Sequence, residues 1–338
     1  MFSFEARDVS EALQFGLEHL LHSGVEEVSR NGPVLVAPGP VCTVYTNPRA
    51  RVLFSPTRDA NPFFHFFEAL WMLAGDNDIA FPSYFNGTYG QFSDDGKTMW
   101  DAYGWRWRRF FGWDQLDAVV AELRGNPTSR RCVLSMWNPM DGCCETDYAR
   151  NDFAVAVSGG KAVPCNTQAY FDLRGGRLNM TVTNRSNDAI WGCYGANQVH
   201  FSFLLEYMAM RVGAPIGLYR QFSNNLHVYT DKFSLDNMNA VIEECEAAPV
   251  VAQGPAMEPG FDDDLKKFMR QAREVIGGVT LWNYDFRQPF FTQVAEPMFM
   301  AWANRKTKKP DAVNCHVERI QAPDWRLACQ EWVERRAK

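Results

Sequence analysis

A cysteine and an Arg-Ser pair stand at the two open ends of one predicted β-hairpin. Cys165 follows Pro164 at the start of an alternating strand. A Gly175–Gly176 turn leads into a second strand, which ends at Arg185–Ser186. A guanidinium beside a thiol lowers the thiol pKa from about 8.5 toward the reactive thiolate, and it can also hold an anionic oxygen. This arrangement favours covalent catalysis by Cys165 on a phosphorylated substrate, although Arg185 alone fits a surface charge equally well.

The composition argues against several classes of protein. The chain has 338 residues, 46% of them hydrophobic and 14% aromatic, so a sizeable aromatic core is expected. A net charge of −6 argues against tight duplex nucleic-acid binding, but not against a small anion held by a few arginines. No apolar run reaches about 18 residues and no secretory leader is visible, so we expect a soluble protein without a membrane span. Nine cysteines without a C-x-x-C spacing, Cys143 and Cys144 among them, fit reduced thiols in the cytoplasm.

Hydrophobic periodicity and turn residues predict one α+β domain over residues 1–338. Helices are predicted over Ser10–Ser23, with Ser10 as N-cap and Gly24 as the stop, and over Asn61–Gly75, Gln198–Gly213, Ser234–Ala248 and Phe261–Gly278. Strands are predicted within Asn31–Pro56, over Arg130–Pro139, in the hairpin, and within Leu218–Tyr229. The last fifty residues are expected to form two helices around a basic turn.

Several separated motifs, in the same order, resemble those of the thymidylate synthase superfamily, which includes phage and antibiotic-pathway pyrimidine-nucleotide hydroxymethylases. RSND over Arg185–Asp188, at the expected spacing from Pro164–Cys165, is similar to the family's Arg-Ser-x-Asp. Further similar segments are SRR and WNP within Ser129–Pro139, EALWMLAGDND from Glu68, MWDAYGWRWR from Met99, NNLHVY from Asn224, and RNG at Arg30. The resemblance covers about residues 30–230 and leaves 286–338 as a divergent helical extension.

The resemblance implies a mixed β-sheet with flanking helices, a sheet-to-sheet homodimer, and one-carbon transfer from 5,10-methylenetetrahydrofolate to C5 of a deoxypyrimidine 5′-monophosphate, with no metal. Cys165 would attack C6 of the base and turn C5 into a carbon nucleophile. Glu68, desolvated in an apolar helix, would relay a proton through water and face the folate. Tyr103 would be a further catalytic residue, Asp188 would bind the pterin ring, and Trp100 would cover the cofactor side.

The resemblance also implies a nucleotide site shared between two subunits. Its residues would be Arg30, Arg185 and Ser186 of one subunit and the partner subunit's Arg130 and Arg131 at the 5′-phosphate, His227 and Tyr229 at the sugar 3′-oxygen, and Asn197 at the base. Four converging arginines repel one another unless an anion lies between them, and a monophosphate meets that need. Each of these arginines, taken singly, fits a solvated surface charge better than a binding residue.

Departures from the family pattern bear on the product. Asn166 stands where synthases have a histidine, and Tyr170 where they have a glutamine. WGCYGAN over Trp191–Asn197 replaces LGLPFN with one extra residue, so that Ala196 is the ungapped match to the base-reading asparagine. Synthases also end in Pro-Val-Ala-Val, whereas this chain runs on through WRLACQEWVERRAK. Methylation needs hydride transfer in a site closed to water, and these changes favour the admission of water and therefore a 5-hydroxymethyl product.

The sequence leaves alternatives open for the base of the substrate and for the product. An asparagine can accept from N3–H and donate to O4 of uracil, whereas an aspartate would suit cytosine, so Asn197 favours dUMP as the substrate. The alternatives are thymidylate synthase proper, a dCMP or CMP hydroxymethylase, and a catalytically silent nucleotide- or RNA-binding relative. Retention of Cys165, Glu68 and Asp188 argues against the silent relative. We expect an enzyme of the cytoplasm, of the host cytoplasm if a phage encodes it.

Overall fold

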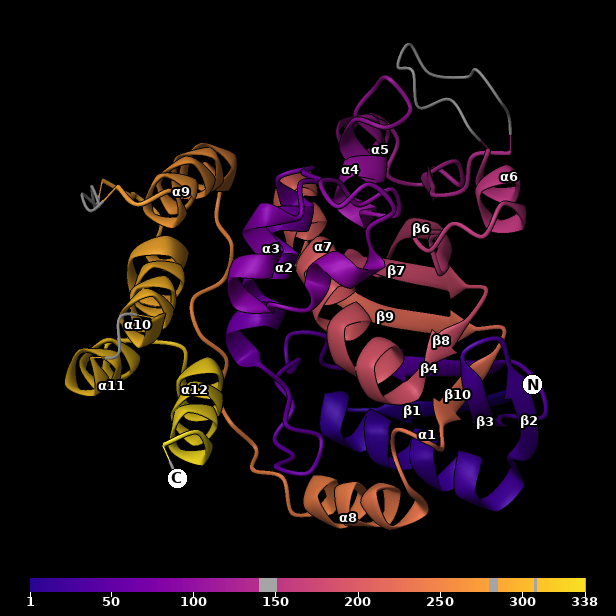
Figure 1. Ribbon diagram of the computed structural model, residues 1–338. Coiled ribbons are helices and arrows are strands. Elements are labelled where there is room, and N and C mark those ends of the chain that lie inside the picture. The colour runs from indigo at the N-terminus through magenta and orange to yellow at the C-terminus, as the bar shows by residue number, and fades with distance from the viewer. Residues whose placement is uncertain (140–150, 280–284, 307–308, 338) are drawn as a thin grey trace. The chain divides into compact units, whose positions relative to one another are not determined.

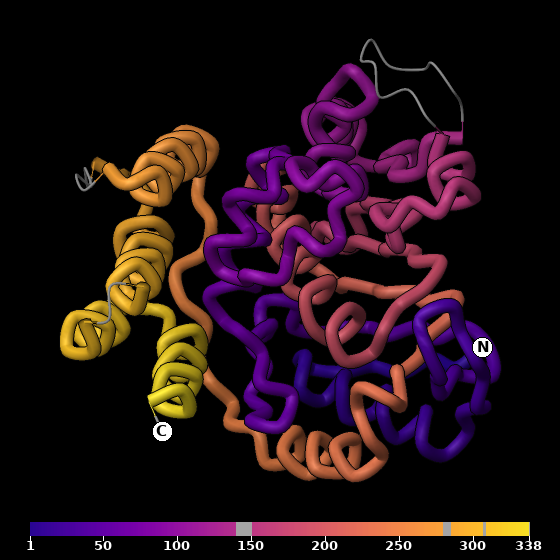
Figure 2. Tube along the Cα trace, viewed as in Figure 1, coloured from indigo at the N-terminus to yellow at the C-terminus, as the bar shows by residue number. Residues whose placement is uncertain are grey.

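The computed structural model describes residues 1–139, 151–279, 285–306 and 309–337, so Cys143 and Cys144 lie outside the described residues. The chain divides into two units, each built from two separated segments. Unit 1 comprises Met1–Ala60 and Arg106–Pro249, and unit 2 comprises Asn61–Trp105 and Val250–Lys338. Figure 2 traces these segments by colour, with the yellow C-terminal end in unit 2. The expectation of one domain over 1–338 stays a prediction.

A six-stranded mixed sheet in unit 1 includes the strand that directly follows the predicted nucleophile, Cys165. Its order is β1 (Phe2–Ala6), β4 (Val41–Tyr45), β9 (Ile216–Ser223), β7 (Arg177–Asn184), β6 (Asn166–Arg174) and β5 (Val133–Ser135). The β1–β4 and β7–β9 pairs are parallel and the other pairs are antiparallel. Strands β6 and β7 form the predicted hairpin, and Figure 1 shows β7 beside β9. Gly175 and Gly176 turn it with φ of 56° and 72°, values that suit a two-residue hairpin loop.

A second, four-stranded sheet in unit 1 joins segments that are far apart in the sequence. Its order is β2 (Val25–Ser29), β3 (Gly32–Val36), β10 (Leu226–Tyr229) and β8 (Asn187–Asp188). His227 on β10 is the register partner of Val36 on β3 and of Asp188 on β8. Residues predicted to bind the sugar and the folate therefore lie on neighbouring strands.

The helices of unit 1 begin and end at identifiable capping residues. They are α1 (Val9–Ser23), α5 (Gln115–Gly125), α6 (Asp152–Val157), α7 (Asn197–Val212) and α8 (Leu235–Glu246), with α4 (Tyr103–Arg108) at the boundary between the units. Gly24 and Gly213 cap α1 and α7 as predicted, and Gly213 has a φ of 84°. The predicted N-cap Ser10 is wrong: the Asp8 side chain accepts from the Glu11 amide and caps α1, while Ser10 is buried in its first turn.

Unit 2 is helical and has an aromatic core. Its helices are α2 (Pro62–Leu73), α3 (Ala80–Phe85), η1 (Tyr89–Phe92), α9 (Phe261–Ile276), η3 (Phe291–Ala295), α10 (Glu296–Lys306), α11 (Pro310–Glu318) and α12 (Pro323–Arg335). Phe66 on the buried helix α2 stacks on Phe290 and meets Trp325 edge-on. Two predicted C-terminal helices become three elements after η3, because Pro310 and Pro323 each begin a new helix. None of the helices in the described segments is long and apolar enough to span a membrane.

Candidate active site

A polar cavity of about 460 Å³ in unit 1 gathers most of the predicted nucleotide-binding residues. Five of them line it: Arg30, Arg185, Ser186, His227 and Tyr229. They come from three separate parts of the chain: the β2–β3 turn, the end of β7, and strand β10. The sheet register described above therefore assembles residues that periodicity alone could not place together.

Three cations and one acid give the cavity a positive lining. Arg30, Arg185 and Lys161 line it together with Glu27. This balance suits a dianionic phosphate, which guanidinium and ammonium groups bind through charge-assisted hydrogen bonds. Lys161 was not found from the sequence, because it lies in the loop between α6 and β6, outside any motif or periodic pattern.

The imidazole of His227 is arranged to meet a neutral hydroxyl. Its Nδ1 lies 2.8 Å from the Asn225 side-chain oxygen, and burial lowers the pKa of His227, so the ring is neutral and Nδ1–H donates to Asn225. Nε2 is then left as an acceptor. The Tyr229 hydroxyl accepts from Asn31 at 3.4 Å, and both Asn31 and Asn225 line the cavity. This pair suits a sugar hydroxyl better than a second charge.

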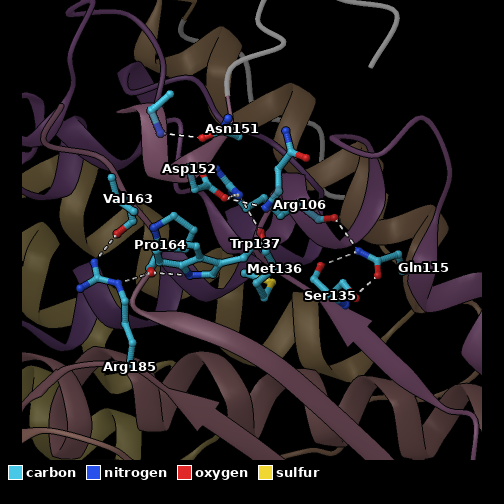
Figure 3. Close-up of polar contacts among 12 residues, drawn as sticks. Arg106, Gln115, Ser135, Met136, Trp137, Asn151, Asp152, Val163, Pro164 and Arg185 are labelled. Carbon is cyan, nitrogen blue, oxygen red and sulfur yellow. Dashed lines mark hydrogen bonds and ion pairs between the residues drawn. The ribbon is translucent and has the colours of Figure 1, made fainter. Parts of the chain in front are cut away.

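Arg185 is tied to the backbone around the nucleophile. Its amide donates to the Cys165 carbonyl at 2.9 Å. Its guanidinium donates from Nε to the Pro164 carbonyl (2.9 Å) and from Nη2 to the Val163 carbonyl (3.0 Å), as Figure 3 shows. Trp137 also donates to the Pro164 carbonyl, at 3.1 Å, and lines the cavity. Nη1 of Arg185 has no partner in the part of the chain that the structure describes, so it is the group open to an anion.

A fully buried ion pair fixes the segment that carries Trp137. Arg106 and Asp152 are both 0% exposed and are joined by two 2.8 Å bonds (Figure 3). Arg106 also donates to the Met136 carbonyl, and the Asn138 amide donates to Asp152 at 2.7 Å. The residues on both sides of Trp137 are thereby held, which keeps its indole hydrogen-bonded to the Pro164 carbonyl, beside Cys165. The predicted strand Arg130–Pro139 is reduced to Val133–Ser135, because these side-chain bonds replace a β-ladder after Ser135.

Asp188 offers one buried oxygen to a hydrogen-bond donor. One carboxylate oxygen accepts from the Trp191 amide at 2.6 Å, which caps the irregular helix η2 (Ala189–Ala196). The other, Oδ2, is buried and has no hydrogen-bond partner among the described residues. Burial raises the pKa of Asp188 to about 6, against the opposing effects of the Trp191 amide and the buried Arg58 guanidinium. An N–H group of a folate pterin ring would satisfy the unpaired oxygen, so the site fits the expected co-substrate.

Asn197 is held by its neighbours at the start of α7. Its Nδ2 donates to the Asn187 side-chain oxygen at 2.8 Å, and Asn187 in turn donates to the Ser223 hydroxyl at 2.8 Å. Asn197 is 8% exposed and does not line the cavity. Its amide orientation is therefore set by protein contacts before any base is bound.

Arg130 and Arg131 do not join this cavity within their own chain. Both are exposed, and they precede β5, an edge strand of the six-stranded sheet. Neither lines the cavity that Arg30 and Arg185 share. Their expected place at the phosphate of a partner subunit stays a prediction.

The remaining predicted residues belong to unit 2. Glu68 on α2 is 5% exposed, and the Tyr89 hydroxyl hydrogen-bonds to it. Trp100 and Tyr103 lie in the same unit. A Cβ added to Gly104 would sit 1.7 Å from the Met72 carbonyl oxygen, so glycine at this position lets the Tyr103–Gly104 backbone touch the helix that carries Glu68. Glu68 and Tyr103 are therefore held on adjoining elements.

The comparisons with known proteins agree with these features. Residues 17–276 match the family model described as "Thymidylate synthase". The chain is 42% identical to the deoxyuridylate hydroxymethyltransferase of Pseudomonas phage M6, over 98% of this chain and 93% of that protein. It is 36% identical to the deoxyuridylate hydroxymethyltransferase of Bacillus phage SP01, over 66% of this chain and 61% of that protein. The match to the family model and the length of the similarity to the phage M6 enzyme show that this chain belongs to the thymidylate synthase family.

Proposed function

We propose that this protein hydroxymethylates dUMP, using methylenetetrahydrofolate and water to give 5-hydroxymethyl-dUMP and tetrahydrofolate. The observation that carries this proposal is the cavity lined by Arg30, Arg185, His227 and Tyr229, in which Arg185 is hydrogen-bonded to the Cys165 carbonyl. Similarity to the phage M6 enzyme along almost the whole chain supports the same reaction.

The nucleotide end of the reaction follows from the cavity. The phosphate lies among Arg30, Lys161 and Arg185, and the sugar hydroxyl meets His227 and Tyr229. Because Arg185 is hydrogen-bonded to the carbonyls of Val163, Pro164 and Cys165, phosphate binding and nucleophile placement are coupled. The Cys165 thiolate then adds to C6 of uracil and makes C5 a carbon nucleophile.

The one-carbon end of the reaction uses Asp188, Glu68 and Tyr103. Methylenetetrahydrofolate supplies the carbon that becomes bonded to C5 of uracil. Asp188 holds the pterin ring through its unpaired oxygen. Glu68 moves protons to and from the base carbonyl and the folate, assisted by Tyr103, and Trp100 covers the folate. No reductant is needed, because water rather than hydride completes the product.

The product decides between this function and a thymidylate synthase. Hydroxymethylation returns tetrahydrofolate, so no dihydrofolate absorbance develops while the nucleotide gains CH₂O. Methylation consumes the hydride of the folate, so dihydrofolate accumulates in step with the nucleotide. Mass spectrometry of the nucleotide showing only a methyl gain, with matching dihydrofolate, would overturn the proposal; turnover of dCMP in preference to dUMP would correct the substrate.

We also propose a homodimer with shared phosphate sites, and the positions of Arg130 and Arg131 support it. Both lie outside the cavity of their own chain, so each site would take the partner subunit's Arg130 and Arg131. We expect inactive Cys165→Ala and inactive Arg131→Ala subunits to regain activity when mixed, because a hybrid dimer contains one intact site. Confirmed hybrid dimers that remain inactive would exclude the shared site. We place the enzyme in the cytoplasm, where its nucleotide and folate substrates occur.

A further inference from the structure

A row of buried amide and hydroxyl side chains joins the nucleophile's strand to the base-reading position. Sheet register places Asn166 opposite Asn184, and Asn184 opposite Ser223. Directly paired residues project from the same face of a sheet, so these three side chains share one face. The row continues through the hydrogen bonds from Asn187 to Ser223 and from Asn197 to Asn187. All five residues are buried, with exposed fractions between 0% and 8%.

The end of this row nearest Cys165 holds polar atoms that lack partners. Asn166 donates from Nδ2 to the Thr183 carbonyl at 2.9 Å, but its Oδ1 is buried and unpaired among the described residues. Nδ2 and Oδ1 of Asn184 are also buried and have no hydrogen-bond partner among the described residues. Asn179, on the same strand as Asn184, is satisfied at both atoms by Asp172 and by the Leu218 amide. The unpaired atoms are therefore a local property of the Asn166–Asn184 pair and not of buried asparagines on β7.

Unpaired buried amides call for a polar occupant. Each buried polar group without a partner lowers the stability of the fold, so three such atoms on two facing residues are destabilising unless a bound group satisfies them. A water molecule is the smallest group that both donates and accepts, and buried water typically makes about three hydrogen bonds to protein. An asparagine pair presents both donors and an acceptor to such a water.

The position of this pair relative to the base rests on the proposed function. Uracil held with O4 at Asn197 and with C6 at Cys165 must place C5 between these two residues, because C5 joins C4 and C6 in the ring. The polar row runs between the same two residues, from Asn197 through Asn187 and Ser223 to Asn184 and Asn166. The carbon that receives the one-carbon unit therefore lies beside the unpaired end of the row.

We propose that Asn166 and Asn184 hold the water molecule that adds to the exocyclic methylene carbon on C5 of the nucleotide. The water oxygen forms the new C–O bond, and the C5–CH₂ double-bond electrons move onto C4–O. Collapse of that enolate re-forms C5=C6 and breaks the bond from C6 to the Cys165 sulfur. The proton released by water balances the one taken up by N5 of the departing tetrahydrofolate. No electrons are gained or lost, so the step needs no oxidant or reductant.

The test separates this step from the steps before it. Tritium leaves C5 of [5-³H]dUMP before water adds, whereas 5-hydroxymethyl-dUMP forms afterwards. The wild-type enzyme should give equal amounts of tritium and hydroxymethyl product. With 2-mercaptoethanol present to compete with water for the exocyclic methylene, Asn166→Ala and Asn184→Ala should lower the ratio of hydroxymethyl product to tritium by about 10- to 100-fold, because a misplaced reactant slows a step by that order. The methylene left waiting should be captured by added 2-mercaptoethanol as a 5-thioether.

Two further variants serve as controls that distinguish the loss of a bound water from a general loss of structure. Asn184→Ser keeps a group that donates and accepts, so it should recover part of the ratio. Asn179→Ala removes a buried, fully paired asparagine from the same strand, so it should lower stability without changing the ratio. A ratio near one in both Asn166→Ala and Asn184→Ala, or an equal fall in Asn179→Ala, would overturn the inference.

The wild-type product distinguishes this inference from the function on which it rests. A wild-type enzyme that makes only thymidylate would overturn both. A wild-type enzyme that makes 5-hydroxymethyl-dUMP, with variants whose ratio does not change, would remove the water-holding role and leave the function standing.

Discussion

The Arg185 amide donates to the Cys165 carbonyl at 2.9 Å, while the Arg185 guanidinium binds the carbonyls of the two residues before Cys165. One arginine thus contributes charge to the phosphate cavity and fixes the segment that presents the nucleophile. Arg30 lines the same cavity from the β2–β3 turn. It contributes positive charge to the phosphate site but does not position the segment that contains Cys165. Phosphate binding and nucleophile positioning can therefore be tested separately in these two arginines, although the motif match assigns both of them to the phosphate.

Arg185→Ala should therefore impair both nucleotide binding and attack by Cys165, whereas Arg30→Ala should impair binding alone. Loss of a charged hydrogen bond costs about 1.5–3 kcal/mol, so each variant should weaken dUMP binding by about 10- to 100-fold. Only Arg185→Ala should also slow adduct formation at saturating 5-fluoro-dUMP with methylenetetrahydrofolate. Mass spectrometry of the adduct peptide checks the rate and the site together. An adduct on a cysteine other than Cys165, or equal rates in the two variants, would contradict this reading.

The sequence predicted those parts of the fold and site that depend on local signals. Gly175–Gly176 indicates the hairpin turn and Gly213 the end of α7, since both need backbone with positive φ. The motif match assigned Arg30, Arg185 and His227 to one site, and all three line one cavity, while their binding roles stay predictions. The N-cap of α1 was misplaced because Asp8 and Ser10 are both good caps, and only the chain's entry angle selects Asp8.

Contacts between segments far apart in the chain could not be predicted from the sequence. Trp137 reaches the cavity on a segment held by the Arg106–Asp152 pair and by its own bond to the Pro164 carbonyl, and Lys161 reaches it from a loop; no hydrophobic periodicity marks either position. Asn184 looked like an ordinary strand residue, and its unpaired amide becomes visible only once the register with Asn166 is known. Asn166 itself was noted from the sequence as a departure from the family, without a role.

Replacing Arg106 by Met should strongly destabilise the protein. The pair with Asp152 is 0% exposed at both residues, and removing one partner of such a pair leaves a buried charge unpaired, at a cost of about 3–5 kcal/mol. Chemical unfolding measures the change in the free energy of unfolding. Arg174→Met, which breaks an exposed pair with Asp172, should cost under about 1 kcal/mol and serves as the control. Equal losses in the two variants would mean that burial does not set the strength of the Arg106 pair.

Asn197→Asp should change which base the enzyme accepts. Asn197 keeps one donor on Asn187, and the rest of its amide can pair with O4 and N3–H of uracil. An aspartate only accepts, so it repels O4 and suits the amino group of cytosine; a buried mismatch of this kind lowers kcat/KM by about 10²-fold or more. The ratio of kcat/KM for dUMP and dCMP in both proteins is the measurement. A wild-type preference for dCMP would show that Asn197 does not read the base as proposed.

Asp188 should limit activity at acidic pH, because it must be ionised to accept from the pterin ring. Burial raises its pKa to about 6, so folate-dependent turnover should fall as the pH drops through that value. Arg58→Met removes a positive charge that lowers this pKa, so the acid limb should move to higher pH. Arg58→Lys keeps the charge and should leave the limb close to that of the wild type. The pH dependence of kcat/KM for the folate, measured in all three proteins, checks the shift.

The same carboxylate should make the protein less stable at neutral pH than an asparagine would. Its folded-state pKa lies above the unfolded value of about 3.9, so its stabilising contribution is complete below that value and is lost as the pH rises through about 6. Asp188→Asn should therefore raise the free energy of unfolding by about 1–3 kcal/mol at pH 7.5 and leave it nearly unchanged near pH 4. Asparagine can still cap η2 by accepting from the Trp191 amide, so the change isolates the charge. The variant should also bind folate poorly. Urea unfolding at both pH values measures the change in the free energy of unfolding. An Asp188→Asn protein that is less stable than the wild type at pH 7.5 would show that the ionised carboxylate stabilises the fold, contrary to this prediction.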